Sequence, residues 1–261
     1  MTTQEEHGPS MLERIDVALA SRLATADGPQ EPIAHAQSVF DGLRRPGATD
    51  AAFFAGLLRL RGLCVAEADA RAVLEDQPGV LAPVHQEYRM IRGLAQALVL
   101  MRRRCAEGRA PDGWFAVELW KCMTAELPRF RGNELRRGPP WDALLYVSYP
   151  TTDQLSFLLD TFDLEHSYRD LPGIFAAFHP VRQGFRILWR FARIAPFPDF
   201  NVVVGWMLMV TWLMGKGYPL IAPEPRDQAM LAKLMSGPPP TRIAMFERRL
   251  YDTLMAALTA G

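Results

Sequence analysis

The sequence predicts a mostly α-helical protein built around one principal domain. Several segments repeat apolar residues at the three- and four-residue spacing of a helix, and residues 202–214 are apolar almost throughout. The chain has 261 residues, of which 49% are hydrophobic and 22% charged. A chain of this length and composition can bury a large core.

Five amphipathic helices are predicted in chain order. Ser10 can cap the first and Thr49 the second, the third covers 84–101, the fourth covers 111–127, and the last lies near the C-terminus. Their apolar positions are Leu12, Ile15, Leu19 and Leu23; Phe53, Phe54, Leu57 and Leu60; Val84, Tyr88, Ile91, Leu94, Leu98 and Met101; Phe115, Leu119, Met123 and Leu127; and Ile243, Phe246, Leu250 and Leu254.

The third helix is followed by the basic triplet Arg102–Arg104. Cations at a helix C-terminus interact favourably with the helix dipole, so we interpret the triplet as a solvated helix end. A phosphate site is the alternative interpretation of these three charges.

The run from Val202 to Met214 is broken only by Gly205 and Thr211. Its thirteen residues are fewer than the roughly twenty that a helix needs to span a bilayer. We therefore predict a buried central helix in this position.

Charge and cysteine usage exclude several classes of protein. Lys plus Arg and Asp plus Glu balance at 29 each, so no net field favours nucleic acid or an anionic membrane. The acidic N-terminus lacks a secretory signal, which favours a cytoplasmic location. Cys64, Cys105 and Cys122 are widely spaced and predict reduced thiols rather than disulfides or a zinc site. The common catalytic motifs of hydrolases, P-loop proteins and zinc proteases are also lacking.

The most informative segment is Arg193–Trp206, which resembles the HPFx(D/E)GNGRxxR signature of Fic-domain proteins. Aligned without gaps, the matching residues are Pro196, Phe197, Asp199 and Asn201. The departures are Ala195, Phe200, Val202, Val203 and Trp206, in place of His, Gly, Gly, Arg and Arg. The resemblance identifies the chain as a degenerate member of the Fic/Fido family.

Most members of that family transfer a nucleotide from ATP to a hydroxyl, and each departure removes a part of that chemistry. Ala195 cannot act as the base that the histidine provides. Phe200 and Val202 add side chains where glycines let backbone N–H groups approach phosphate. Val203 removes the charge and the donors of an arginine. The family mechanism of AMP transfer is therefore not expected, and residual transfer ranks last among the possibilities.

Two polar residues of the motif stay as catalytic candidates. Asp199 could act as an acid or base or hold Mg²⁺, the only cofactor that the resemblance suggests, and Asn201 could polarise a substrate. An aspartate at a helix start also favours the helix dipole without any ligand.

An apolar ligand is the second possibility for the former nucleotide pocket. The residues predicted to line it are Phe197, Phe200, Val202, Val203 and Trp206. Such a pocket suits a small, largely apolar molecule, although the aromatic and methionine-rich face of this helix also fits a core.

The resemblance extends to both sides of the motif. The segments His179–Ile194 and Trp212–Pro219 look like the helices that enter and leave it, with His179 at a helix start. Residues 130–133 and 144–150 resemble a short β-hairpin flap that holds target chains. The segment 57–62 resembles an inhibitory helix, in which Arg61 replaces the inhibitory glutamate.

The fold class expected is thus a mostly α, Fic-like helical domain with a short β-hairpin flap. We expect an N-terminal helical extension at 1–48, a Fic-like core at 49–225, and C-terminal helices at 226–261 packed on the core. A homodimer is possible, because Fic proteins often pair.

Two functional hypotheses follow. The first is a pseudoenzyme that binds a protein partner, for example by adding a strand at the flap. The second is a neofunctionalised enzyme that acts on a small apolar molecule. A cavity filled by side chains would favour the first, and an open apolar cavity with Asp199 and Asn201 pointing inward would favour the second.

Overall fold

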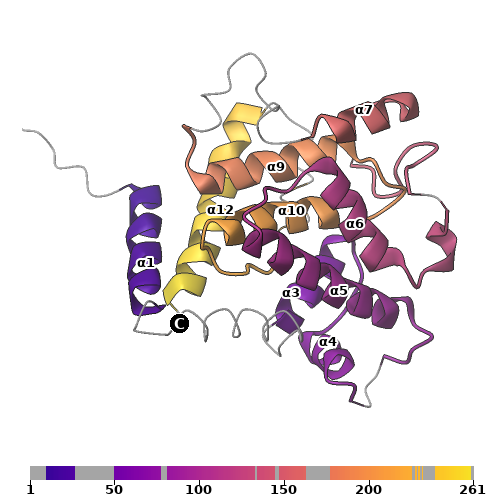
Figure 1. Cartoon of the computed structure of the whole chain (residues 1–261), viewed down its shortest axis with the longest axis horizontal. Coiled ribbons are helices and arrows are strands. Elements are labelled where there is room, and N and C mark those ends of the chain that lie inside the picture. The colour runs from indigo at the N-terminus through magenta and orange to yellow at the C-terminus, as the bar shows by residue number, and fades with distance from the viewer. Residues whose placement is uncertain are drawn as a thin grey trace, which may run out of the picture.

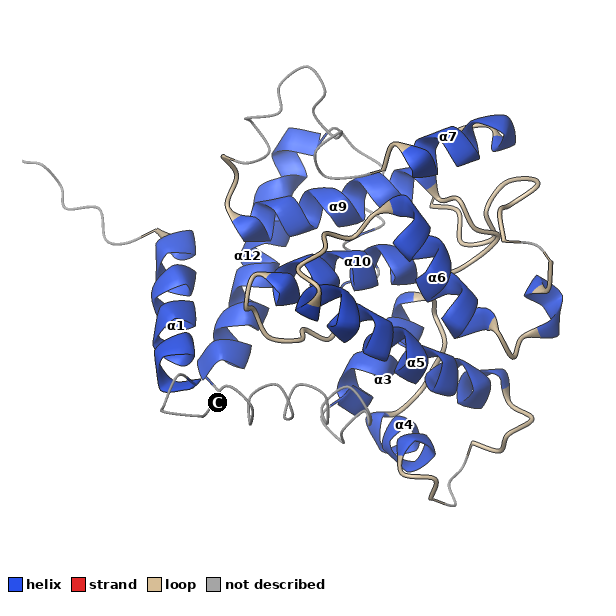
Figure 2. Cartoon of the chain, viewed as in Figure 1, coloured by secondary structure: helices blue, strands red, loops and turns tan. Residues whose placement is uncertain are grey.

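The computed structural model describes residues 10–26, 50–77, 81–132, 134–144, 147–162, 177–224, 227, 229, 231 and 239–259. These residues form helices and loops, and no strand occurs among them (Figure 2). The helices are α1 (Met11–Ala26), α3 (Asp50–Leu60), α4 (Glu67–Leu74), α5 (Gln86–Ala106), α6 (Gly113–Thr124), α7 (Leu155–Asp160), α9 (Pro180–Ile194), α10 (Asn201–Gly215) and α12 (Pro239–Thr259), with 3-10 turns η1 (Pro128–Phe130) and η2 (Thr152–Gln154). The prediction of a mostly α fold is confirmed.

The centre of the fold is α10, as its apolar sequence predicts. Eleven of its residues are buried, and it contacts α9, α5, α3 and α6 (Figure 1). A helix that is apolar on every side must be enclosed by other elements, because no face of it can be left to water. Among the described residues, no helix is long and apolar enough to cross a membrane.

The ends of several helices agree with the sequence. Ser10 Oγ accepts the backbone N–H of Glu13 at 3.3 Å before α1, and His179 is the N-cap of α9, with its Nδ1 accepting the N–H of Val181 at 3.2 Å. The second helix starts at Asp50, but its predicted cap Thr49 lies outside the described residues.

The predicted start of the third helix was wrong. α5 begins after His85, whose Nδ1 accepts the N–H of Ala82 at 3.1 Å and closes a turn. Val84 therefore precedes the helix and is 72% exposed instead of lying on its apolar stripe.

The prediction of a solvated basic triplet was also wrong for two of its three arginines. Arg102 donates to Asp50 at 2.8 Å. Arg104 is buried, donates to the Ala110 carbonyl at 2.9 and 3.0 Å, and pairs with Asp112, the N-cap of α6. The carboxylates of Asp50 and Asp112 come from neighbouring elements, so the sequence of α5 alone could not predict these pairs.

Two elements lie at opposite edges of the fold. α1 packs against α12 at one edge, and α7 lies at the other (Figure 1). The predicted domain boundaries stay predictions, because residues 48, 225 and 226 lie outside the described part of the chain.

The β-hairpin flap is not confirmed. The described residues of this region, 130–132, 134–144 and 147–150, contain no strand, and Asn133, Leu145 and Tyr146 lie outside the description. The described residues of 131–150, called the irregular segment below, form turns and loops that contact the loop between α9 and α10.

The crossing of α5 and α6 depends on a close approach at Gly93. A Cβ atom there would lie 2.5 Å from the carbonyl oxygen of Cys122 and 2.8 Å from Cα of Met123. Both atoms belong to the backbone, so they can move only if the two helices separate.

We expect Gly93→Ala to destabilise the protein by about 1–3 kcal/mol, although alanine is the better helix former. The matched control is Gly215→Ala at the end of α10, where a Cβ would meet nothing within 4 Å, and which should be neutral or slightly stabilising. Urea denaturation of both variants measures the difference. Equal stability of the two variants would contradict the close approach.

Candidate functional site

The loop between α9 and α10 has two residues in the left-handed conformation. α9 ends at Ile194 and is followed by its C-cap Ala195, with φ 43° and its N–H donating to the Phe191 carbonyl at 2.9 Å. α10 is preceded by Phe200, with φ 65°. Pro196 and Pro198 lie between these two residues, and their rings fix their own φ angles. A non-glycine residue in this region costs roughly 1–2 kcal/mol, so the surrounding contacts must hold the loop in place.

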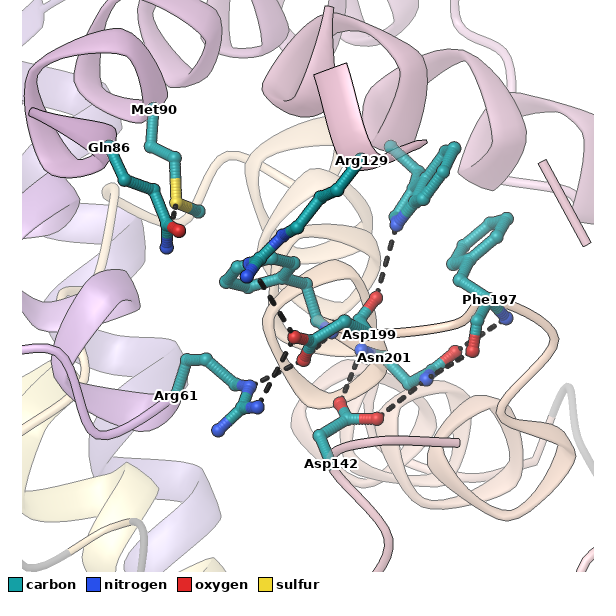
Figure 3. Close-up of polar contacts among 10 residues, drawn as sticks. Arg61, Gln86, Met90, Arg129, Asp142, Phe197, Asp199 and Asn201 are labelled. Atoms are coloured by element: carbon teal, nitrogen blue, oxygen red, sulfur yellow. Dashed lines mark hydrogen bonds and ion pairs between the residues drawn. The ribbon is translucent and has the colours of Figure 1, made fainter. Parts of the chain in front are cut away.

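Asn201 provides part of that support. Its Oδ1 accepts the N–H of Phe197 at 2.9 Å, and its Nδ2 donates to the Phe197 carbonyl at 3.0 Å (Figure 3). The same Nδ2 donates to Asp142 Oδ1 at 2.8 Å. Asn201 is 1% exposed, so its amide braces the loop from inside the protein.

Asp142 places a carboxylate at the N-terminus of α10. Its Oδ2 accepts the backbone N–H of Asn201 at 2.6 Å. An anion is favoured there by the unpaired N–H groups and the helix dipole. Burial nevertheless raises the pKa of Asp142, since desolvation outweighs the hydrogen bonds from Asn201. The chain thus supplies its own anion at the start of α10.

Asp199 lies beside this helix end and is paired with cations. Arg61, directly after α3, bonds both of its oxygens, with Nη2 to Oδ2 at 3.2 Å and a shorter contact from Nε to Oδ1. Arg129 Nη2 lies 3.8 Å from Oδ2 (Figure 3). The bond to Asp199 raises the pKa of Arg61 above its ordinary value. Asp199 also accepts the Phe200 N–H at 2.7 Å and, through its carbonyl, the Trp120 indole N–H at 3.1 Å.

Arg136 holds the irregular segment against this loop. It is 5% exposed and donates to the carbonyls of Ala195 at 2.7 Å, Gly138 at 3.0 Å and Pro150 at 2.6 Å. Its own backbone N–H donates to the Pro196 carbonyl at 2.9 Å. Burial lowers the pKa of this guanidinium, which has backbone carbonyls rather than a carboxylate as hydrogen-bond partners.

A pocket of about 240 Å³ opens next to the N-terminus of α10. Its lining residues are Leu60, Arg61, Trp141, Asp142, Ala143, Leu144, Val202, Val203 and Leu231. Asp199 and Asn201 do not line it, because their side chains are buried and bonded to their neighbours.

Comparison with solved structures finds the same architecture in Fic proteins. A Fic-domain-containing signalling protein from Bacteroides thetaiotaomicron superposes with a TM-score of 0.70 at 16% identity, over 96% of this chain and 95% of that one. Fic-1 from C. elegans gives 0.69 at 14% identity, over 96% and 70% of the two chains. A Fic family protein from Desulfovibrio desulfuricans gives 0.54 at 11% identity, over 99% and 76%. The chain has the Fic fold. No family model and no curated protein matches its sequence.

Within the Fic fold, the segment that resembles the Fic motif occupies the end of α9, the loop and the start of α10. Of the residues predicted to bind a ligand, Val202 and Val203 line the pocket. The other three are buried in the core. The ring of Phe197 stacks on that of Trp120 with 5.1 Å between centroids, and the ring of Phe200 lies 6.0 Å from that of Phe130. The indole N–H of Trp206 donates to the Ile221 carbonyl at 3.2 Å. The catalytic roles of Asp199 and Asn201, and Mg²⁺ binding by Asp199, stay predictions.

The sequence did not indicate Asp142, Arg136 or the role of Arg61 in this site. Asp142 lies 59 residues before its partner Asn201, and Arg136 lies 59 residues before its partner Ala195. Arg61 lies 138 residues before Asp199. The one available signal was Arg61 in the segment that resembles an inhibitory helix, where a cation replaces the glutamate.

We expect Arg136→Met to lower the free energy of unfolding by about 3 kcal/mol, because one buried and two partly buried carbonyls lose a charged donor. The matched control is Arg137→Met, the exposed neighbour, which should change stability by less than about 0.5 kcal/mol. Urea denaturation at neutral pH tests both. A loss at Arg136 no larger than at Arg137 would mean that this side chain does not hold the segment in place.

Proposed function

We propose that this protein is a Fic-fold pseudoenzyme that does not transfer nucleotides and instead binds a protein partner. The observation that carries the proposal is the carboxylate of Asp142 on the N–H of Asn201, at 2.6 Å. A phosphate at the start of α10 would be repelled by this negative charge, which also occupies the N–H of Asn201.

The same conclusion is supported by the residues around the loop. Ala195 is 1% exposed and has no group that can accept a proton from an attacking hydroxyl. Phe200 fills the space that a glycine would leave open, and its ring lies under the guanidinium of Arg61 at 5.8 Å. Removal of even one stabilising donor typically costs about 10²–10³ in rate, and several are replaced together here.

The site also does not fit Mg²⁺. Both oxygens of Asp199 are bonded to Arg61, so a hard cation would have to displace a guanidinium from a buried carboxylate. Among the described residues, no cluster of three or more His, Cys, Asp or Glu side chains could share the ion.

A partner surface is supported by Trp141 at the edge of the pocket. Its side chain is 57% exposed, while its backbone N–H donates to the Pro198 carbonyl at 2.7 Å. Its ring lies 5.7 Å from that of Phe130 and 5.9 Å from the guanidinium of Arg129. An exposed tryptophan on a fixed backbone is typical of the residues that dominate the energy of protein interfaces. The repurposed-enzyme hypothesis has less support, because Asp199 and Asn201 do not line the pocket.

We expect no binding of ATP and Mg²⁺ to the natural protein by isothermal titration, and no transfer of labelled nucleotide to itself or to a model hydroxyl. The comparison is a variant with Ala195→His, Phe200→Gly, Val202→Gly and Val203→Arg, to which Asp142→Asn is added to reduce the charge at the helix start. Thermal melting checks that the variant is folded. Micromolar binding by the natural protein would refute the proposal whether or not the variant folds.

For the partner, Trp141→Ala should reduce the capture of specific proteins from a lysate at least about tenfold, as expected for an interface residue worth more than 1.4 kcal/mol. Trp114→Ala is the matched control, because Trp114 is 54% exposed and lies at the start of α6, outside the pocket lining. Quantitative mass spectrometry of the captured proteins is the measurement. Equal capture by the two variants would exclude this surface.

A further inference from the structure

The pocket beside α10 contains one residue of each charge. Arg61 and Asp142 line it, and the other lining residues are Leu60, Trp141, Ala143, Leu144, Val202, Val203 and Leu231. A phosphate-rich ligand needs an excess of positive charge, which this lining does not have. The balance of one cation and one anion among apolar walls suits a ligand that carries both charges itself.

Arg61 has donor capacity beyond Asp199. Its Nε and Nη2 bond Asp199, and Figure 3 shows its third nitrogen turned away from that carboxylate. No hydrogen bond of Nη1 is found within the described part of the chain. The side chain is 32% exposed, so this nitrogen can reach a ligand in the pocket.

The first turn of α10 offers two further donors. The N–H of Asn201 is bound by Asp142, and that of Val204 bonds the Phe200 carbonyl at 3.0 Å within the helix. The N–H groups of Val202 and Val203 lie between them and have no acceptor among the described residues. The first N–H groups of a helix point out of its N-terminal end, and both valines line the pocket.

Asp142 provides the opposite charge. Each of its oxygens accepts one hydrogen bond from Asn201, and a carboxylate oxygen can accept a second. No cation within the described residues forms an ion pair with it, whereas Asp199 has two such partners. A partly buried carboxylate bonded only to neutral groups gains most from an ammonium group.

We propose that this pocket binds a small zwitterion of the α-amino-acid type with a compact apolar side chain. Its carboxylate would bind Arg61 and the first-turn N–H groups of α10, its ammonium would bind Asp142, and its side chain would contact Leu144 and Leu231. The volume of about 240 Å³ is below the roughly 300–1,000 Å³ of pockets for drug-sized ligands, which suits such a molecule better than a nucleotide. The inference rests on the proposed function, because it requires the former nucleotide site to be closed to phosphate.

Three related probes test this inference on the natural protein by isothermal titration. L-leucine carries both charges, leucinamide lacks the carboxylate, and N-acetyl-L-leucine lacks the ammonium; L-valine and L-methionine vary the side chain. We expect at least one amino acid to bind with a Kd of about 1 mM or below, and the analogues of leucine to bind at least about tenfold more weakly than leucine. Equal binding of leucine and its analogues, or no binding by any of the three amino acids, would overturn the inference.

A variant pair assigns the ammonium contact. Asp142→Asn should abolish the preference for leucine over N-acetyl-L-leucine, whereas Asp252→Asn, at an aspartate that is 53% exposed and outside the pocket lining, should keep it. An unchanged preference in folded Asp142→Asn would exclude the proposed orientation. If that variant does not fold, the three probes on the natural protein decide.

Titration with ATP and Mg²⁺ separates this inference from the proposed function. Nucleotide binding would refute the closed phosphate site and, with it, the basis of the inference. Absence of both nucleotide and amino-acid binding would overturn the zwitterion site alone and leave the pseudoenzyme proposal standing.

Discussion

The start of α10 is the constraint on which the arrangement around the site depends. This helix is apolar on all sides and must run through the core, so its first N–H groups lie at the edge of the core, where they need acceptors. The bond from Asn201 N–H to Asp142 satisfies one of them and joins the irregular segment to the helix. Asp142 belongs to that segment, so its bond to Asn201 also brings the segment over the loop. Arg136 holds the segment there by donating to the Ala195 carbonyl.

The second constraint is the buried charge of Asp199. Its carboxylate is 2% exposed and would be costly without a cation, and Arg61 provides that cation from the end of α3. In the family that the sequence resembles, the segment that corresponds to residues 57–62 carries an inhibitory glutamate. The position that corresponds to Val203 carries an arginine. In this chain, Arg61 provides a positive charge directly after α3, and Val203 is uncharged. The protein thus compensates the charge of Asp199 internally, with the guanidinium of Arg61.

Local patterns predicted the parts of the structure that depend on local interactions. The apolar run from Val202 identified the central helix, Pro180 placed His179 at a helix start, and the motif located the loop before α10. The pairings of Arg61 with Asp199 and of Arg136 with Ala195 were not predicted, because they join segments 138 and 59 residues apart. Arg104 shows the same limit: its sequence neighbours indicate a solvated helix end, whereas Asp112 and Ala110 bury it.

Phe200 combines a backbone cost with a packing gain in the loop before α10. Its left-handed backbone costs roughly 1–2 kcal/mol, which a glycine would avoid. Its ring is 1% exposed and packs against Phe130, and burying a phenylalanine contributes about 1.5–3 kcal/mol. The two terms are of similar size, so the core gains from the aromatic ring what the backbone loses. A glycine at this position would make room for phosphate only by removing a side chain that now supports Phe130 and lies beneath Arg61. One side chain therefore both supports the core and fills the space that a glycine at position 200 would leave open.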